Sequence, residues 1–137
     1  MDTSALRNGP IPVPLIAAVA LVWLGCAAPT LAVNANTYPE LPGPTLKLGR
    51  EVWLGTCAVC HTDDFSGAPQ VTDLHAWQPR IDKGKEILYT QALKGFFGPK
   101  GTQMPARGDN PKLSDQEVKA AVDYMVALVV ALNSKAE

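Results

Sequence analysis

The sequence predicts an all-α domain of three to four helices. Three stretches place apolar residues at helical spacing, and no segment alternates apolar and polar residues over the length of a strand. The chain has 137 residues, which suits one domain. Its folded part, from about Thr45 to Asn133, has fewer than 100 residues. A core of that size usually needs a covalent link or a bound group to be stable.

The N-terminal residues 1–35 differ from the rest of the chain. They carry two charges, and an uncharged run of 14 residues extends from Leu15 to Ala28. That run has the length of a signal-peptide apolar region and is shorter than the ~20 residues of a membrane span. Small residues follow at Ala32 and Ala35, as at a cleavage site. We expect residues 1–35 to be an export signal or an N-terminal membrane anchor.

Three forms of this leader are open. It is cleaved, or residues 11–33 remain as a membrane attachment that tolerates Pro29, or Cys26 is lipidated. Gly25 fits a lipidation motif and Trp23 does not. All three forms place the following domain outside the cytoplasm, which predicts a periplasmic protein. A reduced, unattached cysteine pair would tend to oxidise there.

A Pro- and Gly-rich stretch at residues 36–44 predicts an extended linker before a domain at residues 45–137. The first helix of that domain is expected over residues 46–58. The other Gly- and Pro-rich stretches, at 62–80 and 95–113, are expected to be loops.

The second helix is expected from Lys83 to Lys94, with Asp82 as its N-cap and Gly95 as its stop. The third helix has the clearest start, because Ser114 and Glu117 have the spacing of a capping box. After the box, apolar residues recur at helical spacing: Val118, Ala121, Val122, Met125, Leu128, Val129 and Leu132.

The chemistry is concentrated in Cys57-Ala58-Val59-Cys60-His61, at the end of the first helix. C-x-x-C-H is the attachment sequence of c-type haem. Two thiols three positions apart can each bond one of the two vinyl groups on a haem edge. The next residue then places an imidazole under the iron. The motif therefore predicts one haem c, attached through Cys57 and Cys60.

Other uses of the cysteines fit the sequence less well. A thioredoxin-type pair needs a strand–helix context that is missing here. A structural zinc site needs four ligands, and Cys57, Cys60 and His75 leave only the adjacent His61 as a poor fourth. A disulfide between the two cysteines would leave His61 unexplained.

A low-spin haem also needs a second axial ligand, and the candidates are Met104, Met125, His75 and Met1. Met1 belongs to the leader, and Met125 lies on the apolar stripe of the third helix. His75 follows His61 by only 14 residues. Met104 lies in a Gly-rich loop that can cross to the opposite haem face, so the sequence favours it. A thioether favours ferrous iron and raises the potential.

Residues 48–130 resemble the class I bacterial cytochromes c, most closely the small cytochrome c-five group. That group often has an extra Cys pair after the methionine loop, and residues 108–113 here contain no Cys. The resemblance covers about 80 residues. The matching segments are residues 49–53, the Cys57–His61 box, residues 67–69, 77–80, 92–96 and 104–108, and the helix that begins after Ser114.

The resemblance implies a class I cytochrome c fold around one covalently bound haem, with His61 and Met104 as iron ligands. It implies that the Pro69 carbonyl accepts the His61 ring N–H, which would orient the imidazole. Trp77 and Arg80 are similar to family positions that approach the haem propionates. It further implies a helix crossing at Gly49 and Trp53 on the first helix and Tyr124 on the third.

The charge pattern bears on partners. The chain has 12 Lys and Arg against 13 Asp and Glu, so no basic excess favours nucleic acid. Residues 77–107, however, hold six basic and two acidic residues. If this segment borders the haem edge, it would attract redox donors and acceptors with acidic docking surfaces.

The leading hypothesis for function is therefore a periplasmic one-electron carrier with a His/Met haem c, not an enzyme. The alternative is a haem c subunit of a membrane-bound or periplasmic oxidoreductase complex, held by an uncleaved N-terminal anchor. A haem sensor or ligand-binding enzyme would need an open sixth iron position, which a Met104 ligand closes.

Overall fold

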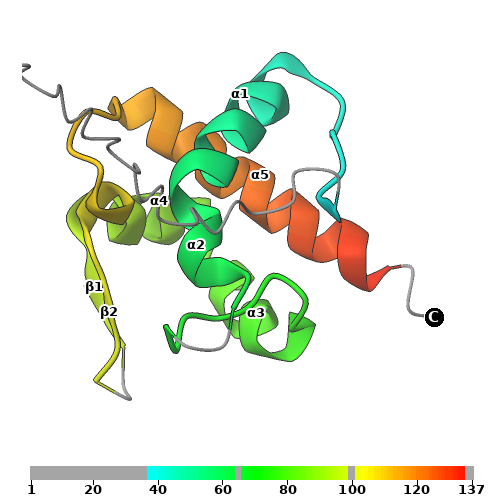
Figure 1. Cartoon of the computed structure of the whole chain (residues 1–137). Helices are drawn as coiled ribbons and strands as arrows, with labels where there is room; N and C mark the ends of the chain where they lie inside the picture. The colour runs from blue at the N-terminus through cyan, green and yellow to red at the C-terminus, as the bar shows by residue number, and fades with distance from the viewer. Residues whose placement is uncertain (1–36, 64–65, 99–100, 135–137) are drawn as a thin grey trace, which may run out of the picture. The chain divides into compact units, whose positions relative to one another are not determined.

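The computed structural model describes residues 37–63, 66–98 and 101–134, which belong to one compact unit, Leu31–Glu137. This part is mostly helical, which confirms the predicted fold class (Figure 1). The expectations for residues 1–35 lie outside it. Within the described ranges, no helix is long and apolar enough to span a membrane. In chain order, the elements are α1 Pro44–Val52, the π-helical segment η2 Trp53–Cys57, α2 Ala58–His61, α3 Leu74–Ile81, α4 Lys85–Lys94, β1 Phe96–Phe97, β2 Gln103–Met104, the short turn η3 Ala106–Asp109 and α5 Asp115–Asn133.

The predicted first helix is present as α1, η2 and α2 in succession. It begins at Pro44, two residues before the expected start, because proline suits the first turn of a helix. Its buried residues are Gly49, Trp53, Ala58 and His61, at spacings of four, five and three. The spacing of five falls in η2, where the Ala58 N–H bonds the Trp53 carbonyl five residues back.

This wider turn determines which way His61 faces. In a regular helix, the twelve residues from Gly49 to His61 would leave the two side chains about a third of a turn apart. A π turn accommodates one extra residue, so the spacing acts as eleven, or about three full turns. One face of the helix therefore carries both Gly49 and His61.

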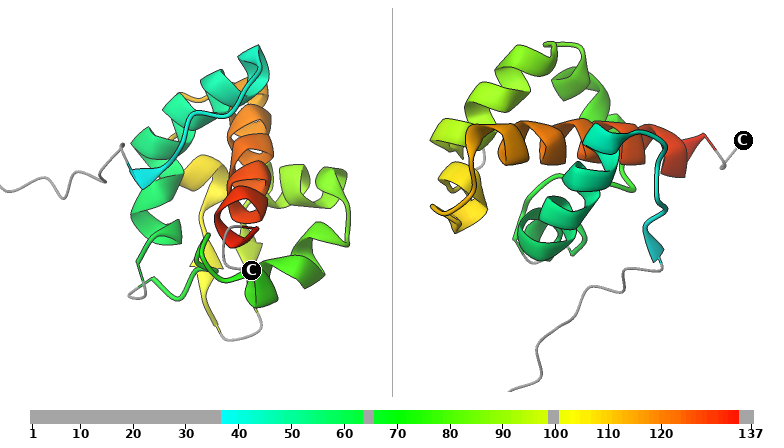
Figure 2. Two further views of the ribbon diagram at one scale, coloured as in Figure 1. Left: turned by 90° about the vertical axis from the view of Figure 1, so that its right-hand side faces the viewer. Right: turned by 90° about the horizontal axis from the view of Figure 1, so that it is seen from above.

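Helices α1 and α5 cross in direct backbone contact (Figure 2). A Cβ atom placed on Gly49 would lie 2.0 Å from the Ala120 carbonyl oxygen. Beside this contact, the Trp53 and Tyr124 rings pack with centroids 5.6 Å apart, and both residues are fully buried. Helix α5 begins with the predicted capping box of Ser114 and Glu117.

Residues 37–43, expected as an extended linker, pack against this crossing. Arg50 Nη2 donates to the Tyr38 carbonyl at 2.9 Å, and the Tyr124 hydroxyl donates to the Pro39 carbonyl at 2.8 Å. The Tyr38 ring meets Trp53 edge-on at 4.9 Å. The folded unit therefore includes these residues as well as the helices.

The stretch expected as a loop at residues 62–80 contains helix α3, so that expectation was wrong. Asp73 caps the helix, because its carboxylate accepts from the Ala76 N–H at 2.9 Å. Pro79 lies inside α3, where it removes one helical donor, and this residue suggested a loop. Burial of Trp77, which is 3% exposed, outweighs that loss.

Helix α4 begins at Lys85, two residues later than expected, because Asp82 ends α3 and Gly84 is the true N-cap. Its predicted stop is correct: Gly95 has φ 83°, which glycine adopts without strain. The second expected loop contains the short antiparallel pair β1–β2, in which Phe96 faces Met104.

The close approach of α1 and α5 leads to the first prediction. Gly49→Ala in the haem-loaded protein should lower the free energy of unfolding by about 3 kcal/mol or more, because a methyl group cannot fit against the Ala120 backbone. Urea unfolding followed by circular dichroism measures this.

Gly55→Ala is the matched control, because a Cβ there meets no atom within 4 Å. It should leave the free energy of unfolding unchanged or raise it by up to about 1 kcal/mol, since alanine favours helix. Equal losses in the two variants would contradict the crossing as described.

Candidate functional site

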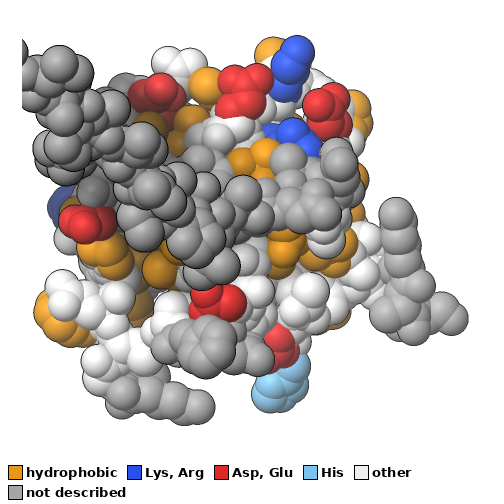
Figure 3. All heavy atoms as spheres, viewed as in Figure 1, with side chains coloured by type: hydrophobic (Ala, Val, Ile, Leu, Met, Phe, Trp, Pro, Cys, Tyr) orange, Lys and Arg blue, Asp and Glu red, His pale blue; other side chains and the backbone are white. Residues whose placement is uncertain are grey.

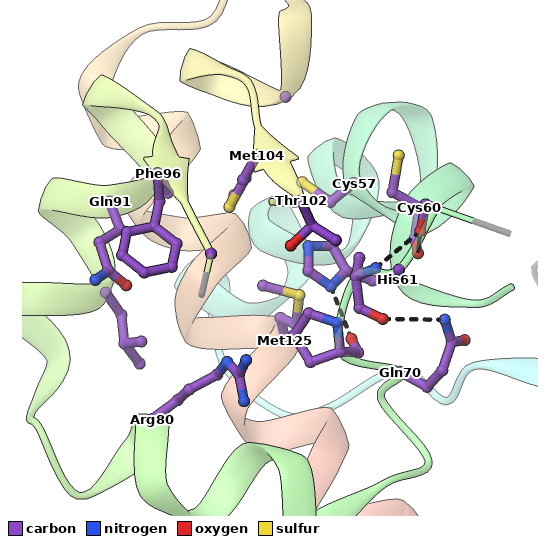
Figure 4. Close-up of a pocket in the computed structure, with 18 of the residues that line it drawn as sticks. Cys57, Cys60, His61, Gln70, Arg80, Gln91, Phe96, Thr102, Met104 and Met125 are labelled. Carbon is purple, nitrogen blue, oxygen red and sulfur yellow. Dashed lines mark hydrogen bonds between the residues drawn. The ribbon is translucent and has the colours of Figure 1, made fainter. Parts of the chain in front are cut away.

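One cavity of about 460 Å³ brings the predicted site residues together. That volume is typical of small-molecule sites, which are roughly 300–1,000 Å³. The cavity lies between helices α2, α3, α4 and α5 and the β1–β2 pair (Figure 4). All seven predicted site residues line it: Cys57, Cys60, His61, Pro69, Trp77, Arg80 and Met104.

His61 is held with one ring nitrogen toward the cavity. Its Nδ1 lies 2.9 Å from the Pro69 carbonyl oxygen, which only accepts, so Nδ1 carries the proton. Nε2 is then the unprotonated nitrogen, and Figure 4 shows it on the cavity side of the ring. Burial lowers the pKa of His61, the Pro69 bond opposes this, and Arg80 adds to the lowering. The ring is thus neutral, as a metal-binding imidazole must be.

The loop that carries Pro69 is fastened at several points. The Trp77 indole N–H donates to the Gln70 carbonyl at 2.8 Å, and the Val71 N–H donates to the His61 carbonyl at 3.1 Å. Ser66 donates to the Cys60 carbonyl at 2.7 Å. Helix α3 and the first helix thereby hold the Pro69 carbonyl in place beneath the imidazole.

The two cysteines approach the cavity from successive parts of the first helix. Cys57 ends the π-helical segment, and Cys60 lies one turn on, in α2 next to His61. Burial, and secondarily Cys60, raises the pKa of Cys57 to about 11, so its thiol is protonated at neutral pH. Both residues line the cavity, and Figure 4 shows the Cys57 sulfur beside the space that the His61 ring faces.

Met104 enters the cavity from β2, and Figure 4 shows its sulfur pointing into the space that His61 also faces. The other candidates differ. Met125 lines the same cavity but is 4% exposed within the hydrophobic core. His75 is exposed and does not line the cavity. Met1 lies outside the described residues.

Arg80 supplies the cationic group of the cavity wall. Its guanidinium donates to the Ala76 carbonyl on its own helix. Among the described residues, no carboxylate forms an ion pair with it. A half-buried guanidinium of this kind suits an anionic group inside the cavity.

These residues fit a haem. The two thiols match its two vinyl groups, the neutral imidazole and the thioether are groups that can bind iron, and Arg80 matches a carboxylate substituent. Apolar side chains from α4 and α5 provide the remaining wall: Leu88, Ala92, Val122 and Met125. In the described ranges, no group of three or more His, Cys, Asp and Glu side chains is arranged to hold a metal ion, so the zinc site weighed from the sequence has no counterpart there.

A model of the cytochrome c family matches residues 46–128. The chain belongs to the cytochrome c family. It is 46% identical over 78 residues to cytochrome c-555 of Chlorobaculum thiosulfatiphilum, a match that covers 57% of this chain and 90% of the relative. It is 34% identical over 88 residues to cytochrome c5 of Azotobacter vinelandii, covering 63% and 100%. These matches confirm the resemblance to class I cytochromes c.

Solved structures give the same fold. The protein superposes with a TM-score of 0.53 and 30% identity on a chain from the crystal structure of the electron transfer complex of nitrite reductase with cytochrome c. The match covers 65% of this chain and 99% of that one. This cytochrome c is accordingly an electron carrier, not an enzyme, and its family carries covalent haem c.

Sequence reasoning missed much of the wall of this cytochrome c site. Gln91, Phe96 and Thr102 also line the cavity, although they are far from the Cys57–His61 box in the sequence. None of them has a residue type that signals haem chemistry. Only the packing of α4 and the β1–β2 pair beside the first helix shows that they belong to the site.

Proposed function

We propose that this cytochrome c is a periplasmic one-electron carrier whose haem iron is bound by His61 and Met104 and is low-spin. The observation that carries the proposal is one cavity with an oriented, neutral imidazole and a thioether facing the same space. The bound haem c supplies one-electron cycling between ferric and ferrous iron.

The protein's own residues limit the change that accompanies electron transfer. Pro69 holds the His61 proton on the nitrogen that faces away from the cavity, so the imidazole presents the same lone pair in both redox states. The apolar wall from α4 and α5 excludes water. Ligands and surroundings that stay fixed favour rapid electron exchange.

The proposal assigns the Met104 sulfur as an iron ligand, so a variant without this sulfur tests the proposal. Met104→Ala should abolish the sulfur-to-iron charge-transfer band of the ferric protein. It should also let the ferrous protein bind carbon monoxide at neutral pH, because the sixth position is open. Visible spectroscopy measures both effects.

Met125→Leu is the control for this prediction. It replaces the other methionine that lines the cavity by a side chain of similar volume, which cores tolerate. The charge-transfer band should persist. If the band were lost in Met125→Leu and retained in Met104→Ala, the ligand would be Met125 and the proposed assignment to Met104 would be wrong.

Export across a membrane is the second part of the proposal. It is supported by the apolar leader and by the packing of residues 37–43, which a chain cleaved before Asn36 would keep. We expect the native protein to begin near Asn36, as intact mass spectrometry of material from the original host would show. A retained leader would instead support the anchored subunit of an oxidoreductase complex.

The partner is proposed to be a redox protein with an acidic docking surface. The similar chain of the nitrite reductase complex supports a protein partner of this class. Lys85 and Arg107 form ion pairs with Asp123 and Asp115, so they contribute less to docking than their charges suggest. Lys94 has no such partner among the described residues.

One residue, Gly95, separates Lys94 from an apolar pair. Phe96 lines the cavity and Phe97 is 72% exposed. On the face drawn in Figure 3, hydrophobic and uncharged side chains cover the β1–β2 region, whereas charges of both signs are mixed over α1. An apolar contact with a positive neighbour beside the cofactor cavity suits a brief encounter with an acidic protein.

Charge reversal tests this docking surface. Lys94→Glu should slow oxidation of the ferrous protein by hexacyanoferrate, an anionic oxidant, severalfold at low ionic strength. The difference should disappear at high salt, because salt screens exposed charges. Stopped-flow absorbance measures the rates.

The matched control is Lys47→Glu on α1, which makes the same change in net charge at another exposed site. Its rate should change much less. Equal slowing by the two substitutions would show that overall charge, and not a local surface, attracts the oxidant.

A further inference from the structure

The segment directly after Met104 has an unusual backbone. Arg107, Gly108 and Asp109 have φ angles of 56°, 64° and 66°. Three successive residues therefore occupy the left-handed region, which glycine adopts freely and side-chain-bearing residues rarely do. Arg107 and Asp109 are the only non-glycine residues in that region within the described ranges, so a restraint must hold this turn.

The restraint comes from the Arg107 side chain. Its Nη1 donates to the Leu113 carbonyl at 2.8 Å, and its Nη2 contacts the Asp115 carboxylate at 2.5 Å. Asp115 is the first residue of α5. The guanidinium thus ties the turn to the start of a helix that is itself packed into the core.

The turn also fits against the haem-attachment segment. A Cβ atom placed on Gly108 would lie 2.8 Å from the Thr56 methyl group, in the residue before Cys57. The Gly108 N–H donates to the Pro105 carbonyl at 3.1 Å. The turn is therefore held between the start of α5 and the π-helical segment that carries the first thiol.

Met104 is fixed on both sides by these contacts. Before it, the β1–β2 pair joins it to Phe96. After it, Pro105 leads directly into the strained turn. We infer that Arg107 is a positioning residue for the sixth haem ligand, because its clamp on Leu113 and Asp115 keeps the Met104 loop closed over the cavity. The inference rests on the proposed His61/Met104 ligation.

Without the clamp, the strained turn would relax and the loop would open more often. A small external ligand such as imidazole binds ferric iron only when Met104 has left it. Its apparent affinity is therefore proportional to the population of the open state. This affinity reports on the loop independently of electron-transfer activity.

The experiment measures imidazole binding to the ferric holo-protein by optical titration. Arg107→Ala should bind imidazole roughly tenfold more tightly than wild type, since a charged pair and a hydrogen bond to the turn are lost. Arg107→Gly removes the clamp and the backbone strain together, so its affinity for imidazole should lie between those of wild type and Arg107→Ala. Amide hydrogen exchange of residues 106–110 should be faster in both variants.

Asp115→Asn is a milder second variant that decides the question if the Arg107 variants do not accumulate with haem. It should raise the imidazole affinity in the same direction by a smaller factor. Tyr124→Phe is the control for general destabilisation, because it removes a hydroxyl that donates to the Pro39 carbonyl and interacts with Arg50, outside the Met104 loop. It should lower the midpoint of unfolding and leave imidazole binding unchanged.

Wild-type affinity in Arg107→Ala, or in Asp115→Asn where the Arg107 variants cannot be made, would overturn the inference. An equal rise in Tyr124→Phe would overturn it too, because loosening of the whole fold would then explain the effect. Absence of the sulfur-to-iron band in the wild-type ferric protein is a separate outcome. It would refute the proposed ligation itself.

Discussion

The rest of this structure depends on which side chains lie on the same face of the first helix, from Pro44 to His61. The chain from Pro44 to His61 has to pack against α5 at Gly49 and present His61 to the cavity with the same face. A regular helix would turn these residues away from each other, and the π turn at Trp53–Cys57 corrects the angle. Backbone contact at Gly49 leaves the helix no room to shift. The position of the His61 imidazole, the proposed iron ligand, therefore follows from a contact three turns earlier.

The site combines residues from one short stretch of sequence with residues that lie far from this stretch in the sequence. Cys57, Cys60 and His61 come from one stretch of helix, so their relative placement follows from their spacing. Pro69 and Met104 come from two segments farther along the chain, and each segment is held by a contact of its own. Small, independent restraints thus fix an imidazole and a thioether that the chain brings together from more than 40 positions apart.

Charge serves two purposes on this surface. Lys85 bonds Asp123, whose carboxylate also accepts from Tyr89, and this cluster joins α4 to α5. Burial of the phenol, and secondarily its hydrogen bond to Asp123, raises the pKa of Tyr89 to about 12, so the hydroxyl stays a donor throughout the neutral range. Charges used in this way stabilise the packing around the cavity. Lys94 has no such pairing among the described residues, which leaves it for partners.

The sequence alone indicated the haem-attachment chemistry and the helical class, because these depend on short-range patterns: the Cys57–His61 spacing, the Ser114 capping box and the stop at Gly95. The tertiary structure decided what depends on distant contacts. Helix α3 forms despite Pro79 because Trp77 becomes buried, and no local pattern carries that energy. The left-handed turn at Arg107 is likewise bonded to groups later in the chain, the Leu113 carbonyl and the Asp115 carboxylate.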